Sequence, residues 1–491
     1  MNDSVSGSLL QRLRERGVVR VAASYAVIAW LLLQIADVTF EPLGVPRWAM
    51  VALIVTAFLG LPVVVALAWF YEVGDTGVRR DTAPDGTARP TVTGLRRNAD
   101  IGIILVLLAV IGVLLVRQPG IEPSGHETPT IAVLPFANID RTEQGEVLAL
   151  GLAESILHQL AGLSEIDVIA RASSFALQDT KADAVEIGKR LDARYLLGGT
   201  MQRAGDRLRV VAYLMDAKSG GQVWSIRFDR PTGDIFAVQD EIAVQVTQAL
   251  ELSIGPKAME RMTTQGTANL AAYLAYLQGR KLLANARVVD AREAIEHFGR
   301  CLKLDPGFAA AYVSMAEADL FVAEYDVTGD RRDRFEQAWG HGQQLIAKAL
   351  EIDPGNGEAF LHRAYLMAFI DLVRAEKDYR RGLELSPNSA KGHAGLAAVV
   401  YETPERRDEA LQLLDRARKL DPLEPGYDVT KALFLLMARG ALEESNALLV
   451  DVVKRHPKYP PALARLAELR YLMGEAASSI LYGEQALELD P

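Results

Sequence analysis

The sequence predicts a multi-domain fold with three transmembrane α-helices, a compact α/β domain and an all-α solenoid. Three observations support this prediction. The first 117 residues contain three apolar runs, and the stretch 129–255 alternates short apolar segments with segments of helical spacing. From 268 to 491 the chain repeats an apolar helical tail that ends at a proline. A chain of 491 residues has room for two to four domains.

Composition excludes some classes of function. The formal net charge is −10, from 53 Lys and Arg against 63 Asp and Glu, so nucleic acid is not the expected partner. The single cysteine, Cys301, rules out an intrachain disulfide and a multi-thiol metal site. We expect Cys301 to be a small buried residue of a repeat.

The membrane module is predicted over 1–117, with spans at about 18–40, 49–71 and 100–117. A helix needs about 20 apolar residues to cross a bilayer, and about 17 suffice with suitable flanks. Arginines precede the first span and fill the Gly-, Pro- and Thr-rich linker 72–100, which we expect to be irregular. By the positive-inside rule the N-terminus is cytoplasmic at a bacterial inner membrane, and residues after about 118 are periplasmic. This topology leaves no cytoplasmic room for a cyclase, kinase or DNA-binding domain.

The α/β domain is predicted over 129–255. Strands are expected at 130–136 and 166–170 and from 193 onward, where two alternating strands join at a tight turn, Lys218–Gly221. Helices are expected at 147–163, 185–193 and 234–252. The order β-α-β-α-β-β-β-α predicts one sheet with helices packed on it.

Long strings in this region resemble a known family. They are PTIAVLPFANI, DARYLLGGTMQRAGDRLRVVAYLMDAKSGGQVWS and FDRPTGDIFAVQDEIAVQVTQAL, which are similar to the TolB N-terminal-like (FlgO-like) domain. The N-terminal RLRERGVVRVAASYAVIAWLLLQIAD resembles the membrane segment of such proteins. The resemblance implies a bacterial membrane protein that couples this domain to tetratricopeptide repeats. It implies little about activity, because the domain occurs in regulators, cyclases and proteins of no assigned function.

One acidic cluster is a candidate catalytic site. Asp140, Glu143, Glu146 and Glu154 surround the first helix and suggest a metal or acid/base site, although solvated charges near a helix N-terminus are the better interpretation. The run starting at Lys218 lacks the spacing of a phosphate loop. No HExxH, GxSxG or dinucleotide-binding motif is present. We therefore expect no catalytic residue, cofactor or metal, and an enzyme of unrecognised type is the weakest hypothesis.

The repeats have a measurable period. Prolines close the tails at positions 306, 354, 387, 422, 457 and 491, with spacings of 48, 33, 35, 35 and 34. A period near 34 with proline after the second helix is typical of tetratricopeptide repeats. The stretch 268–491 therefore predicts a tetratricopeptide solenoid of about six helical hairpins, each of which must stack on its neighbours. The 48-residue spacing holds an insertion of about 14 residues, around 323–342, which is either a loop on the binding face or a longer connection without a role.

These features favour an inner-membrane-anchored periplasmic scaffold that binds protein or peptide partners through its repeats. The alternative is a sensor that relays periplasmic binding to a cytoplasmic partner. Besides the lipid bilayer, a second copy of the chain is an expected partner, because the last repeat has no polar cap; the other explanation is that the natural chain continues beyond Pro491. Candidate partner-binding residues on the repeats, for which solvated surface is the alternative interpretation, are Tyr312, Phe360, His393, Arg331 and Arg332.

Overall fold

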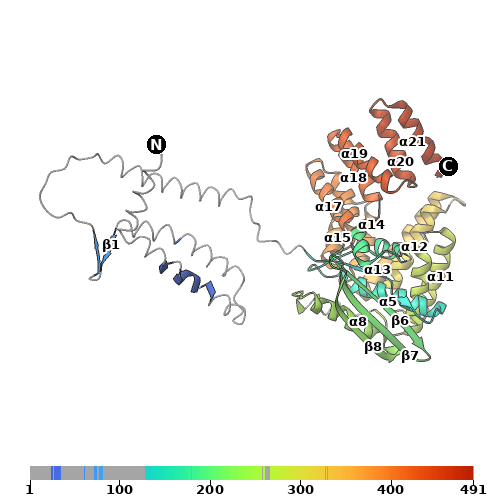
Figure 1. Cartoon of the computed structure of the whole chain (residues 1–491). Coiled ribbons are helices and arrows are strands. Elements are labelled where there is room, and N and C mark those ends of the chain that lie inside the picture. The colour runs from blue at the N-terminus through green and yellow to red at the C-terminus, as the bar shows by residue number, and fades with distance from the viewer. Residues whose placement is uncertain are drawn as a thin grey trace. The chain divides into compact units, whose positions relative to one another are not determined.

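The computed structural model describes residues 128–489 except 179, 257, 260–265, 327 and 329, together with residues 24–25, 27–31, 33–34, 60, 71–74 and 77–80. The chain divides into two compact units, Met1–Gly120 and Ile121–Pro491 (Figure 1). The predicted boundaries at 117, 129, 255 and 268 stay predictions.

The first unit contains a short hairpin. Strands β1 (Tyr71–Gly74) and β2 (Gly77–Arg80) pair antiparallel. The start of the linker 72–100, which we expected to be irregular, is therefore ordered as a strand pair.

The predicted membrane spans require a correction. Most of 18–40 and 49–71 and all of 100–117 lie outside the described residues. In the part of the chain that the structure describes, no helix has the length and apolar character needed to cross a bilayer. The fold class is therefore corrected to a mainly helical protein with a small sheet and a repeat solenoid.

One mixed sheet organises the start of the second unit. Its strand order is β5-β3-β6-β7-β8, and β4 also pairs with β6. Strand β3 is parallel to both of its neighbours, whereas β6, β7 and β8 form an antiparallel meander. The strands are β3 (Thr130–Val133), β4 (Ala137–Asn138), β5 (Asp167–Val168), β6 (Tyr195–Ala204), β7 (Arg207–Asp216) and β8 (Gly221–Pro231).

Helices cover both faces of this sheet. The main core joins Leu152 and Ile156 of α5 (Glu143–Ala161) to Ile242 of α8 (Ile235–Ala249) and to β3, β6 and β7. On the other face Ile187 of α7 (Ala184–Leu191) packs on Ala132. A short helix that the sequence did not predict, α6 (Arg171–Ala176), follows β5.

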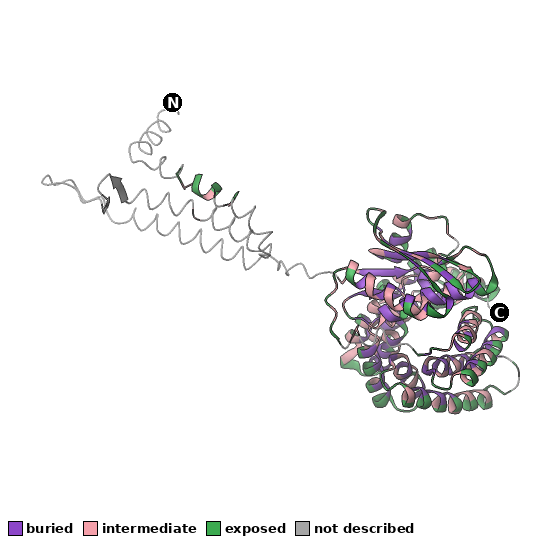
Figure 2. Ribbon diagram, turned by 90° about the horizontal axis from the view of Figure 1, so that it is seen from below, coloured by how far each residue is buried: buried purple, intermediate pink, exposed green. Residues whose placement is uncertain are grey.

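The helical repeats are confirmed. Six antiparallel helical hairpins follow one another in the described residues, and in Figure 2 their helices form a curved row with exposed residues along its outer side. The pairs are α10 (Leu270–Leu283) with α11 (Val288–Leu304), α12 (Ala309–Tyr325) with α13 (Arg331–Ile352), α14 (Gly357–Met367) with α15 (Leu372–Leu385), α16 (Ala390–Tyr401) with α17 (Arg407–Leu420), α18 (Gly426–Arg439) with α19 (Leu442–Arg455), and α20 (Pro460–Leu472) with α21 (Ala476–Leu489).

Small residues allow these helices to approach closely. Ala294 and Ala375 are fully buried beside the aromatic rings of Phe298 and Tyr379. A Cβ atom added at Gly279 would lie 2.5 Å from Cε1 of Phe298, so glycine is needed where that ring crosses α10.

The insertion does not form a loop, contrary to both expectations. Helices α12 and α13 have 17 and 22 residues, against 11 and 14 in α14 and α15. Apolar helical spacing continues to Tyr325, and Asp330 begins α13 by accepting hydrogen bonds from the amides of Arg332 and Asp333. The extra residues therefore lengthen two helices.

Candidate functional site

The α/β region and the solenoid first meet where α5 packs on α10. Leu277 packs closely on Gly151, because a Cβ atom added to Gly151 would lie only 2.2 Å from Cδ1 of Leu277. The buried Tyr273 hydroxyl lies 2.7 Å from the Ser155 hydroxyl and accepts a hydrogen bond from Gln239 at 2.8 Å. This α5–α10 contact joins the first repeat to the sheet domain.

A pocket of about 400 Å³ opens beside this contact. Its walls come from α5 and α6 and from the first helix of each of the first four repeats, α10, α12, α14 and α16. A volume of this size is within the usual range for ligand sites. We name it the inner pocket.

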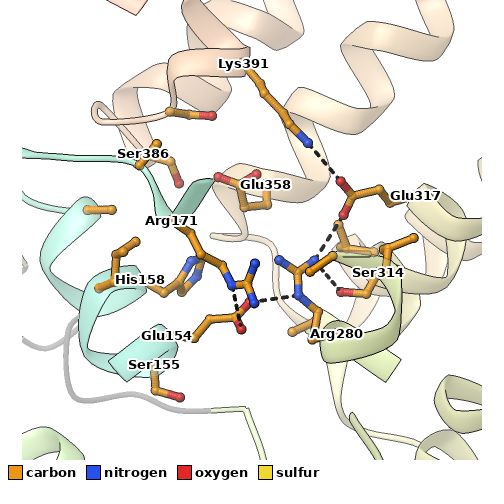
Figure 3. A pocket seen from close by; sticks show the side chains of 18 of the residues that line it. Glu154, Ser155, His158, Arg171, Arg280, Ser314, Glu317, Glu358, Ser386 and Lys391 are labelled. Atoms are coloured by element: carbon orange, nitrogen blue, oxygen red, sulfur yellow. Dashed lines mark hydrogen bonds and ion pairs between the residues drawn. The ribbon is translucent and has the colours of Figure 1, made fainter. Parts of the chain in front are cut away.

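A row of alternating charges crosses the inner pocket (Figure 3). Glu154 accepts hydrogen bonds from Nε of Arg171 at 3.1 Å and from Nε of Arg280 at 2.9 Å. Nη1 of Arg280 donates a hydrogen bond to Glu317 at 3.1 Å, and Nζ of Lys391 donates to Glu317 at 3.0 Å. This charge ladder links α6, α5, α10, α12 and α16, so it fixes the distances between the walls.

Burial and the charge ladder shift the pKa values of the Glu154 and Glu317 carboxylates in opposite directions. Burial opposes ionisation of Glu154, but Arg280 and Arg171 outweigh it and hold the pKa of Glu154 below its ordinary value. Burial likewise opposes ionisation of Glu317, while Lys391 and Arg280 hold its pKa well below normal. Burial lowers the pKa of His362. At neutral pH both glutamates are therefore ionised and His362 is uncharged.

This ladder predicts a pH dependence of stability. A carboxyl group whose pKa is lower in the folded state stabilises the fold above its unfolded pKa, about 4.5, and loses that contribution as the pH falls through the folded value. We expect the free energy of unfolding of the wild type to fall more steeply below pH 4.5 than that of Glu317→Gln, in urea titrations of both proteins. Parallel pH profiles would contradict this expectation.

Other groups of the inner pocket remain available to a ligand. Within the described residues, the Glu358 carboxylate and the His362 ring make no hydrogen bond or ion pair, and Arg171 donates only through Nε. Tyr276, Phe308 and others supply an apolar wall. The inner pocket can therefore hold an apolar group beside a hydrogen-bond donor for Glu358.

Three of the predicted partner-binding residues lie on the pocket helices, but none of the three lines the pocket. The Tyr312 hydroxyl of α12 donates to the Pro306 carbonyl at 3.3 Å. The Phe360 ring of α14 lies under the guanidinium of Arg363, and His393 Nε2 of α16 lies 3.0 Å from the Pro387 carbonyl oxygen. These contacts hold the side chains against their own repeats.

The other two predicted residues lie at the start of α13. Arg331 is exposed, and Arg332, also exposed, pairs with Glu336 at 2.9 Å. Close to them in sequence, Phe335 meets Phe369 with ring centroids 5.9 Å apart. The structure does not bring Arg331 or Arg332 to the inner pocket.

The acidic cluster around α5 is dispersed. Only Glu154 enters the charge ladder, whereas Glu146 pairs with Lys281 at 3.4 Å and Asp140 accepts from the amide of Arg203 at 3.3 Å. Across the described ranges, no group of three or more His, Cys, Asp or Glu side chains could hold a metal ion. Lys218 lies in the β7–β8 turn, as predicted, where Asp216 accepts from its amide at 2.8 Å.

Prediction from the sequence missed Arg171, Arg280, Glu317 and Lys391. Each is a single charge on an otherwise ordinary helix face, and charged residues are usually exposed. It also missed Asn388, for which a signal exists. The repeat endings read DPG twice and then SPN, so Asn388 replaces a glycine.

Comparison with known proteins gives partial matches, and no family model matches the chain. The putative adenylate cyclase 3 of Rhizobium meliloti is 34% identical over 220 residues, which are 44% of this chain and 37% of that protein. The transcriptional regulator HilA of Salmonella typhimurium is 24% identical over 365 residues, 72% of this chain and 61% of that protein. The chain thus spans less than two thirds of these relatives.

Among solved structures, PilW, a widely conserved type IV pilus biogenesis factor, matches with a TM-score of 0.36 and 15% identity. The match covers 44% of this chain and 92% of PilW. A TM-score this low carries no argument, so the assignment of repeats rests on the six hairpins of the chain itself.

The prediction that the chain is not an enzyme is corrected by the first relative. A protein that is 34% identical over 44% of this chain bears the name of an adenylate cyclase. That name describes the relative, of which this chain spans 37%.

Proposed function

We propose that the protein is a protein-binding scaffold that takes a peptide segment of its partner into the inner pocket. One observation carries this proposal: the first helices of four successive repeats line the pocket together with α5 and α6, and some of its polar groups have no partner within the described residues. Stacked repeats present extended concave surfaces that bind partners.

The chemistry of the pocket describes the segment. The apolar wall around Tyr276 and Phe308 favours an aliphatic or aromatic side chain. Glu358 favours a neighbouring hydrogen-bond donor, such as a backbone N–H or an amide side chain. The charge ladder is internally paired, so it sets the width of the pocket.

A peptide selection tests the proposal. Peptides selected from a random displayed library on the wild-type chain would be titrated against Ala284→Trp, which fills the pocket from the end of α10. We expect affinity to fall at least about tenfold, equivalent to about 1.4 kcal/mol. Lys458→Trp adds the same ring at an exposed turn and should leave affinity unchanged. Equal binding to both variants, or no selected peptide, would contradict the proposal.

A sensor is the second candidate function. The names of the two relatives, a putative adenylate cyclase and a transcriptional regulator, favour it. In this proposal the α/β region, which resembles a TolB N-terminal-like domain, and the repeats form the sensory part. Deleting the interior of the linker, Arg79 to Arg97, should silence a sensor and spare the peptide binding of a scaffold.

Placement at a bacterial inner membrane, with residues after about 118 in the periplasm, is also a proposal. It rests on the arginines that flank the N-terminal apolar runs. A phosphatase active only in the periplasm, fused to Pro491, should be active. Activity of a fluorescent cytoplasmic reporter at the same position would contradict the placement.

Self-association is a further proposal. Ile480 and Leu487 are exposed on α21, the last helix of the described solenoid. Sedimentation equilibrium of the wild type and of Ile480→Glu tests whether a second copy covers them.

A further inference from the structure

We propose that a second, polar contact between the solenoid and the α/β region controls access to the inner pocket, and that a partner peptide enters when this contact opens. It joins residues 161–173 to the repeat turn at 386–390 and to the end of α17 with the turn that follows it, 416–423. We name it the clasp. The inference rests on the proposed function for its ligand, but the opening itself can be measured without a peptide.

Asn388 forms the first half of the clasp. Its side chain is 5% exposed, and its Nδ2 group lies within hydrogen-bond distance of the carbonyl oxygens of Ala161, Leu163 and Ile166, at 3.2, 2.8 and 3.0 Å. Its Oδ1 atom accepts from the amide of Val168 at 3.1 Å. A single side chain of the solenoid thus forms hydrogen bonds with backbone groups of the segment before β5 and with a backbone amide on the outer edge of that strand.

The next repeat turn forms the second half. The Ser173 hydroxyl donates to Asp421 at 2.5 Å and accepts from the amide of Leu423 at 2.9 Å. The amide of Ala170 donates to the Leu420 carbonyl at 2.7 Å. All of these bonds join residues that are far apart in the sequence.

A buried carboxylate completes the clasp. Asp167 is 2% exposed, and it pairs with Arg416 at 2.7 Å and Lys419 at 2.8 Å. Burial opposes its ionisation, but the hydrogen bonds from Arg416 and Lys419 outweigh this effect and hold the pKa of Asp167 below its ordinary value. Arg416, on α17, is thus part of the clasp.

The clasp and the α5–α10 contact differ in kind. The α5–α10 contact joins directly to the apolar core of the first repeat, and the hydrogen bonds of Tyr273 and the ion pair of Arg280 with Glu154 add to this apolar packing. The clasp is mainly hydrogen bonds and ion pairs, which exchange readily with water because their net free energy is small. Repeats contact chiefly their neighbours, so small rotations between α12 and α15 can move the clasp while the α5–α10 contact stays closed.

The inner pocket lies between the two contacts. Asn388, Lys391 and Asp421 line it on the clasp side, and Tyr273 and Leu277 line it on the other side. Separating the clasp would therefore remove one wall and leave the opposite wall in place.

The repeat turns show that this docking is specific. The residue after the turn proline is Gly307, Gly355, Asn388, Leu423 and Lys458 in successive turns. A Cβ atom at Gly307 or Gly355 would meet only the aspartate of its own turn, at 3.3 Å, and Lys458 is exposed. Asn388 contacts the α/β region directly, and Leu423 also packs on its smaller core. The two turns that contact the α/β region are therefore the ones in which the residue after the proline, Asn388 or Leu423, reaches that region with its side chain.

Hydrogen exchange and thiol labelling of the full chain test the clasp. In Asn388→Ala we expect exchange at residues 163–170 to rise at least about tenfold, with exchange in α5 and α10 near Tyr273 unchanged. A Ser314→Cys reporter inside the pocket should then react about tenfold faster with a maleimide. Cys301, whose pKa burial and Asp305 raise to about 12, supplies a slow background.

Lys458→Ala is the matched control, because it truncates the residue at the same turn position outside the clasp. Asp167→Asn is a second variant, to be used if Asn388→Ala fails to fold. It keeps the shape of the side chain, and hydrogen exchange at residues 163–170 should rise less than in Asn388→Ala. If hydrogen exchange rises in a variant but the labelling rate of Ser314→Cys stays the same, the clasp does not control access to the inner pocket. This conclusion would hold whether or not the selected peptides bind. Unchanged exchange in both variants would overturn the clasp. Faster labelling together with a failure to select any peptide would support control of access by the clasp and reject the proposed function.

Discussion

Arg280→Ala should lower the free energy of unfolding by about 3 kcal/mol, the low end of the cost of breaking a buried ion pair, because the site is partly exposed. Arg280 holds both Glu154 and Glu317, so its removal leaves two carboxylates with one partner each. Urea denaturation followed by circular dichroism measures the change. Peptides selected on the wild type should also bind more weakly, because the ladder sets the width of the inner pocket.

The control for this prediction is Arg332→Ala. Its ion pair with Glu336 is exposed, with 86% of the arginine side chain accessible, and exposed pairs contribute at most about 1 kcal/mol. A loss for Arg280→Ala no larger than that of the control would show that the ladder is not a structural link.

Gly199→Ala should be at least as destabilising, by about 3 kcal/mol or more, as expected for overpacking against atoms that cannot move away. A Cβ atom at Gly199 would lie 2.2 Å from Cε1 of Phe136 and 2.3 Å from the carbonyl oxygen of Val211. The second contact is with the backbone of the neighbouring strand β7, so the sheet itself must shift. The midpoint of urea denaturation should fall accordingly.

Gly233→Ala provides the matched control for this glycine. An added Cβ at Gly233 meets nothing within 4 Å, so its effect should stay within about 0.5 kcal/mol. A stable Gly199→Ala protein with an unchanged sheet would contradict the packing between β6 and Phe136.

Local features of this fold were readable in the sequence. The prolines at 306, 354, 387, 422 and 457 lie in the turns after the second helices of successive hairpins, because proline cannot continue a helix and the tail before it has helical spacing. The expected helix at 185–193 corresponds to α7, and the expected turn at Lys218–Gly221 joins β7 to β8. These features depend on neighbours a few residues away.

The candidate site was not readable in the same way. Glu154 and Arg280 are 126 residues apart, and Asn388 reaches Ile166, 222 residues away, only because the solenoid curves back toward the α/β region. That curvature is the sum of small rotations between repeats, which no single motif encodes. The prediction for the insertion was wrong for a related reason. The length of an insertion does not distinguish a loop from two longer helices, whereas the apolar spacing that continues up to Tyr325 indicates longer helices.

The position of the clasp in the chain has a consequence for the order of folding. Ser173 and Asp421 are 248 residues apart, whereas the hairpins between them form from contacts within single repeats. Local contacts form early, and long loops close only after the intervening chain is ordered. Newly made chains should therefore complete the sheet and the first repeats before Asn388 reaches its three carbonyl oxygens. Until then the edge of β5 is open to any other strand or turn, including one from a neighbouring molecule.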